Sequence, residues 1–140
     1  MVREFKEEDK DQVMEIWLIS NLQCHDFIPP KYWRSNYNEV SRILNLATVY
    51  VYEEKGEILG FLGAMEDFVV GLFVKEKARG KGIGKALLNA EKERQGSLSL
   101  AAYEKNPRAI RFYMREGFKV QSERVDESTG EKEMLLSWKK

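Results

Sequence analysis

Apolar side chains recur at helical spacing in two segments near the start of the chain. After a short β-like stretch at residues 2–6, a helix is predicted from Asp9, with an inner face made of Val13, Ile16, Trp17 and Ser20. Pro29-Pro30 interrupts the chain, and a second helix is predicted from the spacing of Trp33, Tyr37, Val40 and Leu44. The loop between the two helices carries His25, Asp26 and Phe27.

The pattern changes to strands in the middle of the chain. Residues 48–52 are β-branched and aromatic and predict a strand, Lys55-Gly56 forms a turn, and residues 57–65 predict a second strand in the opposite direction. Glu66-Asp67 is a polar break before residues 68–74, a nearly continuous apolar run. Such a run is typical of a strand that is buried on both faces, and it predicts a central position in the sheet.

Helices and strands alternate in the last part of the chain. A helix with Ile83, Leu87 and Ala90 on its inner face is predicted to end near residues 95–96, followed by a strand at residues 97–103. Asn106 is predicted to be the N-cap of another helix, with Pro107 at its first position, and Gly117 to end that helix. Residues 118–125 and 132–138 complete a hairpin. The order β-α-α-β-β-β-α-β-α-β-β predicts one mixed α/β domain over residues 1–140.

Composition narrows the classes of function. The 140 residues contain 23 Lys and Arg and 23 Asp and Glu, and zero net charge argues against broad nucleic-acid binding. One cysteine, Cys24, excludes an internal disulfide, and with one histidine it makes a structural zinc site implausible. We expect no metal. The N-terminus does not have the form of a signal peptide, and no apolar run approaches the ~18 residues of a membrane span, so a cytoplasmic protein is expected.

The sequence KARGKGIGKALLNAE at residues 77–91 places three glycines and several basic residues ahead of a predicted helix. A helix N-terminus leaves about four N–H groups unpaired and carries roughly half a positive charge. Glycines allow a ligand to approach the backbone closely, so this stretch favours a pyrophosphate. The alternative is a glycine-rich turn with solvated lysines. Neither a Walker A loop nor a dinucleotide fingerprint fits the spacing.

The spacing that fits is Arg79-x-x-Gly82-x-Gly84 after the strand residues Leu72-Phe73-Val74, which resembles the acyl-coenzyme-A loop of the GNAT superfamily of N-acetyltransferases. The later run from Asn106 through Phe112-Tyr113 to Gly117-Phe118 resembles a second motif of that superfamily. The N-terminal residues Trp17-Leu18, His25-x-Phe27-Ile28 and Tyr32-Trp33 resemble the small bacterial YiaC-type acetyltransferases. This resemblance implies a GNAT fold, with a mixed sheet of about six to seven strands and about four helices.

The resemblance implies transfer of an acetyl group from acetyl-CoA to an amine. The backbone of Leu72, Phe73 and Val74 is expected to bind the pantetheine arm, with a main-chain N–H of Phe73 or Val74 on the thioester oxygen. The pyrophosphate is expected to lie on a set of loop residues: Arg79, Gly80, Lys81, Gly82, Ile83, Gly84 and Lys85. Asn106 is expected to contact the coenzyme, and Tyr113 to contact it and act as general acid toward the departing thiolate.

The general base stays open. Some family members have a glutamate five positions before the motif asparagine, where this chain has Ala101. The remaining candidates are Glu66, which we favour among the side chains, Asp67, Glu104 and His25, or a water relay without a dedicated base.

The acceptor also stays open. His25 and Phe27 are candidate acceptor contacts. The expected acceptor is an amine of a protein, at a lysine or an N-terminus. The alternatives are a small amine such as a polyamine, or a non-catalytic acyl-CoA-binding module. The oligomeric state is open, with a dimer among the options.

Overall fold

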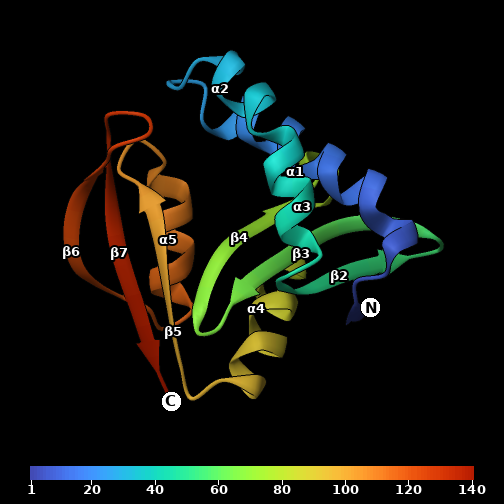
Figure 1. Cartoon of the computed structure of the whole chain (residues 1–140). Helices are drawn as coiled ribbons and strands as arrows, with labels where there is room; N and C mark the ends of the chain where they lie inside the picture. Colours follow the sequence, from blue (N-terminus) through green and yellow to red (C-terminus); the bar gives the residue numbers. More distant parts are fainter.

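Seven strands form one mixed sheet in the order β1-β2-β3-β4-β5-β7-β6 in the computed structural model, which describes residues 1–140 (Figure 1). The strands are β1 Val2–Glu4, β2 Thr48–Glu54, β3 Glu57–Met65, β4 Phe68–Val74, β5 Ser97–Tyr103, β6 Lys119–Asp126 and β7 Glu131–Lys139. All neighbours are antiparallel except β4 and β5, which are parallel. The element order matches the sequence-based prediction except for one additional helix near the start of the chain, and the mixed α/β class is confirmed.

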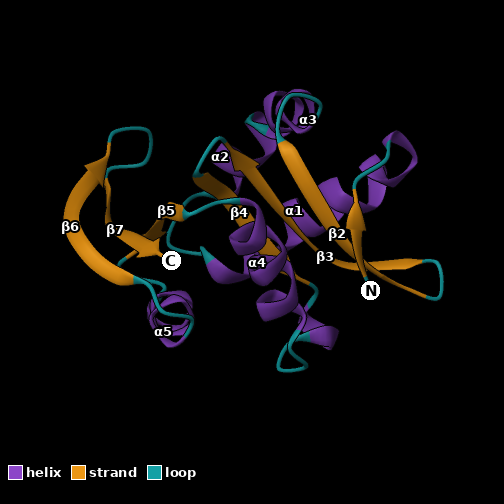
Figure 2. Ribbon diagram, turned by 90° about the horizontal axis from the view of Figure 1, so that it is seen from below, coloured by secondary structure: helices purple, strands orange, loops and turns teal.

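Five α-helices cover the two faces of the sheet. They are α1 Lys10–Cys24, α2 Pro30–Ser35, α3 Tyr37–Leu44, α4 Ile83–Arg94 and α5 Pro107–Arg115, and short 3-10 turns span Glu7–Asp9 and Glu76–Ala78. Figure 2 shows α1, α2 and α3 on one face and α4 and α5 on the other. Each face has its own apolar cluster. None of these helices is long and apolar enough to cross a membrane.

The second predicted helix is divided in two at Asn36. The backbone N–H of Asn36 donates to the carbonyls of Tyr32 and Trp33, both at 3.2 Å. Its side-chain Nδ2 also donates to the Tyr32 carbonyl, at 2.7 Å. These bonds satisfy the last carbonyls of α2, so the helix ends and α3 starts in a new direction. The apolar spacing continues across the break, which is why the sequence predicted one helix.

Strand β4 is central, as predicted, but it is not buried on both faces. Only Val69 is buried, and Val70 has 51% of its surface exposed. The strand that is buried almost throughout is β3, from Ile58 to Ala64. The apolar run predicted burial on both faces, but β5 pairs with only the first two residues of β4, and the rest of the strand, from Val70 to Val74, lies beside the opening and stays partly or largely exposed.

Candidate active site

Strands β4 and β5 separate soon after they start. Phe68 pairs with Ser99 and Val69 with Leu100, and no later residue of β4 pairs with β5. From Val70 to Val74, the edge of β4 toward β5 therefore carries main-chain groups without a partner strand. An edge of this kind can bind an extended ligand, which pairs with it as another strand does.

The loop after β4 leads into the N-terminus of α4. Gly80 and Gly82 have φ of 79° and 82°, in the left-handed region that favours glycine. An added Cβ at either position meets no atom within 4 Å, so the outer surface of the loop is open. The first bond of the helix runs from Ala86 N to Gly82 O at 3.0 Å. The N–H groups before Ala86 have no acceptor within the helix and are available to a ligand.

Basic side chains surround this helix end. Arg79 Nε donates to the Val74 carbonyl at 3.0 Å, which holds the guanidinium against the end of β4. Lys81 and Lys85 are exposed, and the first turn of α4 contains no acidic residue. The unpaired N–H groups, the positive end of the helix and these three cations together favour a phosphate-bearing ligand.

Helix α5 packs closely against the start of α4. A Cβ added at Gly84 would lie 3.3 Å from Phe112 Cζ, so Phe112 or the start of α4 would have to shift by a few tenths of an ångström, whereas Val74 Cγ2, at 3.8 Å, would be in ordinary van der Waals contact. Gly84 thus has a packing role that differs from the conformational role of Gly80 and Gly82. The result is that α5 and the glycine loop form one continuous region.

Tyr113 lies in the apolar cluster beneath α4 and α5. It is 9% exposed, and its ring centroid is 5.2 Å from that of Phe112 and 5.7 Å from that of Phe118. Burial raises the pKa of the Tyr113 phenol well above its ordinary value, because the apolar surroundings penalise the phenolate. The phenol has no hydrogen-bond partner in the protein. It therefore stays protonated and keeps its O–H free to donate.

Asn106 is the N-cap of α5, as the sequence predicts. Its Oδ1 accepts from Ala109 N at 3.3 Å, and its Nδ2 lies 3.1 Å from His25 Nε2. The other ring nitrogen, His25 Nδ1, lies 2.7 Å from Asn21 Oδ1. At the other end of α5, Gly117 has φ of 95°, in agreement with the predicted left-handed end of the helix.

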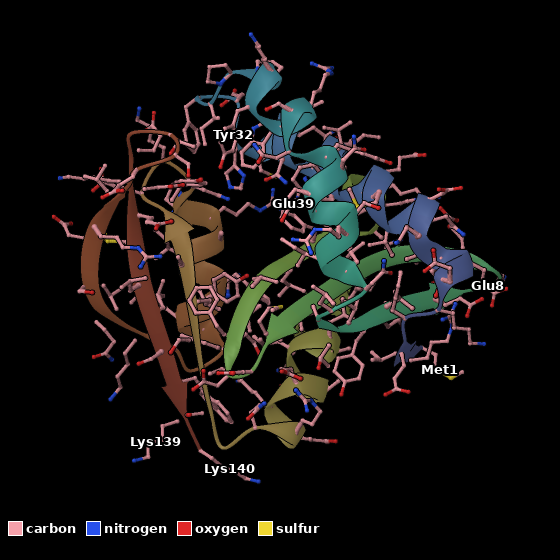
Figure 3. All side chains as sticks on the ribbon, in the orientation of Figure 1. Met1, Glu8, Tyr32, Glu39, Lys139 and Lys140 are labelled. Atoms are coloured by element: carbon pink, nitrogen blue, oxygen red, sulfur yellow. The ribbon has the colours of Figure 1, made fainter.

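Phe27 contacts His25 in an aromatic cluster between α1, α2 and β5. The His25 ring centroid lies 5.1 Å from Tyr103, 5.7 Å from Phe27 and 5.7 Å from Trp33. Burial lowers the pKa of His25 to about 4. The side chain of Tyr32, labelled in Figure 3, lies on the side of α2 toward the β5–α5 and β6–β7 loops. His25 and Phe27, the two acceptor contacts expected from the sequence, therefore belong to one aromatic cluster.

Glu66 lies apart from these residues. It occupies the turn between β3 and β4 with φ of 55°, and its carbonyl accepts from Gln95 Nε2 at 3.0 Å. This turn precedes the paired residues of β4 and β5, whereas the glycine loop and Asn106 follow the ends where the strands have separated. The Glu66 carboxylate has no ion-pair or hydrogen-bond partner. The structure does not bring Glu66 together with Asn106 or the glycine loop.

Three side chains at the site have no role in the sequence-based prediction. Asn21 is four residues before His25 on a helix, a spacing that places both on one face and is readable from sequence. Tyr103 donates to Asp126 Oδ2 at 2.7 Å, which ties β5 to the β6–β7 turn. Arg108 lines a hollow of about 550 Å³ whose other lining residues are Gln23, Cys24, Glu76, Arg79 and Asn106. For Tyr103 and Arg108, the sequence offers no comparable signal.

The comparison with protein families gives one assignment. Residues 45–120 match the family described as "Acetyltransferase (GNAT) domain". This range includes β2 to β5, the glycine loop, α4 and α5.

Similar proteins extend over almost the whole chain. The peptidyl-lysine N-acetyltransferase YiaC of Escherichia coli (strain K12) is 36% identical over 140 residues, 99% of this chain and 96% of that protein. The peptidyl-lysine N-acetyltransferase YjaB of Salmonella typhimurium is 28% identical, over 97% of this chain and 94% of its own length.

Among solved structures, apo-form YjaB from Escherichia coli has a TM-score of 0.86 at 26% identity, over 99% of this chain and 96% of that one. PaiA N-acetyltransferase from Thermoplasma acidophilum, solved in complex with coenzyme A, has a TM-score of 0.82 at 22% identity, over 100% of this chain and 98% of that one.

Proposed function

The chain belongs to the GNAT acetyltransferase family, and from this premise we propose that it transfers the acetyl group of acetyl-CoA to the amine of a protein lysine. The divergence of β4 and β5 beside the glycine loop carries the proposal, because it joins an open strand edge to an anion-binding helix end. The lysine acceptor is supported by two relatives that are named peptidyl-lysine N-acetyltransferases.

The geometry fits the two parts of a coenzyme A molecule. The free edge of β4, from Val70 to Val74, offers alternating N–H and C=O groups to the amides of the pantetheine arm. The N–H groups at the start of α4 and the side chains of Arg79, Lys81 and Lys85 bind the pyrophosphate. Because Gly80 and Gly82 have no Cβ, the phosphates reach the main chain directly.

Acetyl-CoA supplies a thioester that an amine can attack. In this proposal a main-chain N–H of Phe73 or Val74 donates to the oxygen that gains charge during the attack. Because the strand fixes this donor before the reaction, no reorganisation is needed. Such donors contribute about 3–4 kcal/mol to transition-state stabilisation in other enzymes.

We assign the role of proton donor to Tyr113, toward the sulfur that departs as a thiolate. Its raised pKa means that full proton transfer to a thiolate of pKa about 8.5 runs uphill. The phenol therefore acts first as a hydrogen-bond donor to the developing negative charge. Its burial against Phe112 and Phe118 keeps it in a fixed orientation for this task.

For removal of the amine proton, the geometry favours a water relay without a dedicated base. Glu66 lies at the paired end of β4 and β5. His25 is a very weak base, because its pKa is lowered to about 4 and both ring nitrogens already have partners. An acceptor lysine then has to reach the site in its neutral form.

The test begins with thermal melts in parallel solutions of acetyl-CoA, ATP and NAD. A ligand at about 100 times its Kd stabilises by about 2.7 kcal/mol, which raises Tm by roughly 5 °C at this chain length. We expect a shift with acetyl-CoA alone, followed by acetylation of lysine peptides detected by mass spectrometry. A shift with only ATP or NAD contradicts the proposal. Acetylation confined to polyamines contradicts the protein acceptor and leaves the acetyl transfer standing.

A further inference from the structure

His25 and Asn106 are 81 residues apart in the sequence and meet across the opening between β4 and β5. Helix α1, which ends just before His25, lies on one face of the sheet, and α5, which starts just after Asn106, lies on the other (Figure 2). The contact therefore connects the two helices at the open end of the sheet. It does so where the strands themselves are no longer paired.

The hydrogen bonds around His25 are compatible with only one arrangement of protons. Asn106 Oδ1 accepts from Ala109 N, so Asn106 Nδ2 faces His25 Nε2 and donates to it. On the other side, Asn21 Nδ2 donates to the Trp17 carbonyl at 2.9 Å, so Asn21 Oδ1 faces His25 Nδ1 and accepts from it. His25 must therefore be neutral, with its proton on Nδ1.

The surroundings of the ring support the same assignment. Asn21 is 2% exposed, and the imidazole is enclosed by Phe27, Trp33 and Tyr103. The apolar enclosure disfavours the imidazolium form, and a second proton on Nε2 would face the amide hydrogens of Asn106. The neutral ring is thus the only form in which every polar group in this series of hydrogen bonds, from Asn21 through His25 and Asn106 to Ala109, has a compatible partner.

We propose that His25 is a positioning residue: as a neutral link between Asn21 and Asn106, it holds the start of α5 at a fixed distance from α1 and so fixes the width of the coenzyme opening. The inference rests on the proposed function, because it takes the opening between β4 and β5 as the coenzyme site. His25 acts through Asn106 and does not itself contact the reacting atoms. Asn106 in turn caps the helix that carries Tyr113.

The direct test is the protonation of the ring in the free protein. In 15N NMR of histidine-labelled protein at pH 7, we expect a protonated Nδ1 and an unprotonated Nε2, unchanged on titration to about pH 5. The single histidine makes the assignment unambiguous. A proton on Nε2, or a charged ring at pH 7, overturns the proposal. This measurement needs no activity, so it separates failure of the link from failure of the proposed function.

Two amide substitutions separate the two bonds. In His25→Gln, the side-chain amide reaches the position of Nε2 and can accept from Asn106, whereas in His25→Asn it reaches only the position of Nδ1. His25→Phe keeps the ring shape and removes both bonds. We expect His25→Phe and His25→Asn to raise the KM for acetyl-CoA by about two- to tenfold, the range for one lost hydrogen bond, with a smaller change in kcat. His25→Gln is expected to recover most of this loss.

A matched control is Tyr37→Phe, which alters an aromatic residue of the same apolar cluster outside the link. Its KM for acetyl-CoA is expected to equal that of the unmodified protein. Equal KM values for His25→Phe and the unmodified protein overturn the proposal, as do equal losses in the Gln and Asn variants. If the unmodified protein shows no acetyl transfer while the NMR result holds, the proposed function fails and the link remains. If His25→Phe does not fold, the KM values for acetyl-CoA of His25→Gln and His25→Asn are compared instead, and equal values overturn the proposal.

Discussion

Lys92 Nζ, on α4, donates a hydrogen bond to the main-chain carbonyl of Glu116, just after the end of α5. The ammonium also lies 5.0 Å from the ring centroid of Trp138 and 5.7 Å from that of Phe118. Lys92 therefore satisfies a carbonyl at the C-terminus of α5 and packs over two aromatic rings. Together with the His25–Asn106 contact, it means that both ends of α5 are held by side chains from elsewhere in the fold.

Removal of the Lys92 charge is expected to destabilise the protein. Lys92→Met keeps most of the side-chain stem and loses the helix-end hydrogen bond and the cation–π contacts, which we expect to lower the free energy of unfolding by about 1–2 kcal/mol. Urea denaturation measures the change. The matched control is Lys119→Met, at an exposed lysine without an ion-pair partner, where the change is expected to stay within about 0.5 kcal/mol. Equal stability of the two variants contradicts this role of Lys92.

Tyr113→Phe is expected to separate catalysis from stability. The phenol has no hydrogen-bond partner in the protein, so its removal leaves the free energy of unfolding nearly unchanged. Loss of a proton donor to the thiolate is expected to lower kcat by about 10²–10⁴-fold. The acetyl-CoA shift in Tm is the internal control and should persist. A kcat equal to that of the unmodified protein removes Tyr113 from the mechanism.

Gly56 and Gly82 form a natural pair for testing the loop. Both have φ of 82°, and at both an added Cβ meets no atom within 4 Å. Alanine at either position therefore costs a similar conformational strain, about 1–2 kcal/mol. Only Gly82 lies at the start of α4, so Gly82→Ala is expected to weaken acetyl-CoA binding severalfold more than Gly56→Ala, as measured by isothermal titration calorimetry. Equal binding by the two variants contradicts the assignment of the pyrophosphate to this loop.

The pH dependence of stability is expected to carry a contribution from His25. Its pKa is about 4 in the folded protein and 6.5 without the fold, so the unfolded chain binds a proton first as the pH falls. The negative charge of Asp26 raises the pKa of His25 and opposes this shift only in part. The contribution to stability is complete above pH 6.5 and is lost between pH 6.5 and 4, by roughly 3 kcal/mol.

The measurement for this prediction is urea denaturation of the unmodified protein and His25→Phe across the same pH range. The difference between the two free energies of unfolding should change through that interval and stay constant above it. A difference that is independent of pH would show that His25 titrates normally in the fold.

The local features of this site, which depend on residues close together in the chain, can be predicted from the sequence. The Asn106 cap and the Gly117 helix end follow from the preferences of single residues, and both agree with the structure. These features depend on neighbours within about four positions along the chain.

What the sequence did not reveal depends on contacts between distant segments. The apolar run of β4 is compatible with full pairing, and only the course of β5 leaves its edge open. In the same way, the pattern around His25 is that of a loop histidine, and its partner Asn106 becomes known only when α1 and α5 are placed in space. The end of α2 at Asn36 is a different case, because the side chain bonds to the Tyr32 carbonyl four residues earlier, a local contact that the apolar spacing does not indicate.

The short seam between β4 and β5 has a consequence for how the molecule unfolds. Because only two residue pairs join these strands, the sheet consists of a four-stranded and a three-stranded unit that share a core under α4 and α5. Such units can open with different free energies. A ligand that bridges the gap as an extended segment makes the two units one cooperative body. The supply of acetyl-CoA would then set how long each molecule survives proteolysis, as well as how fast it works.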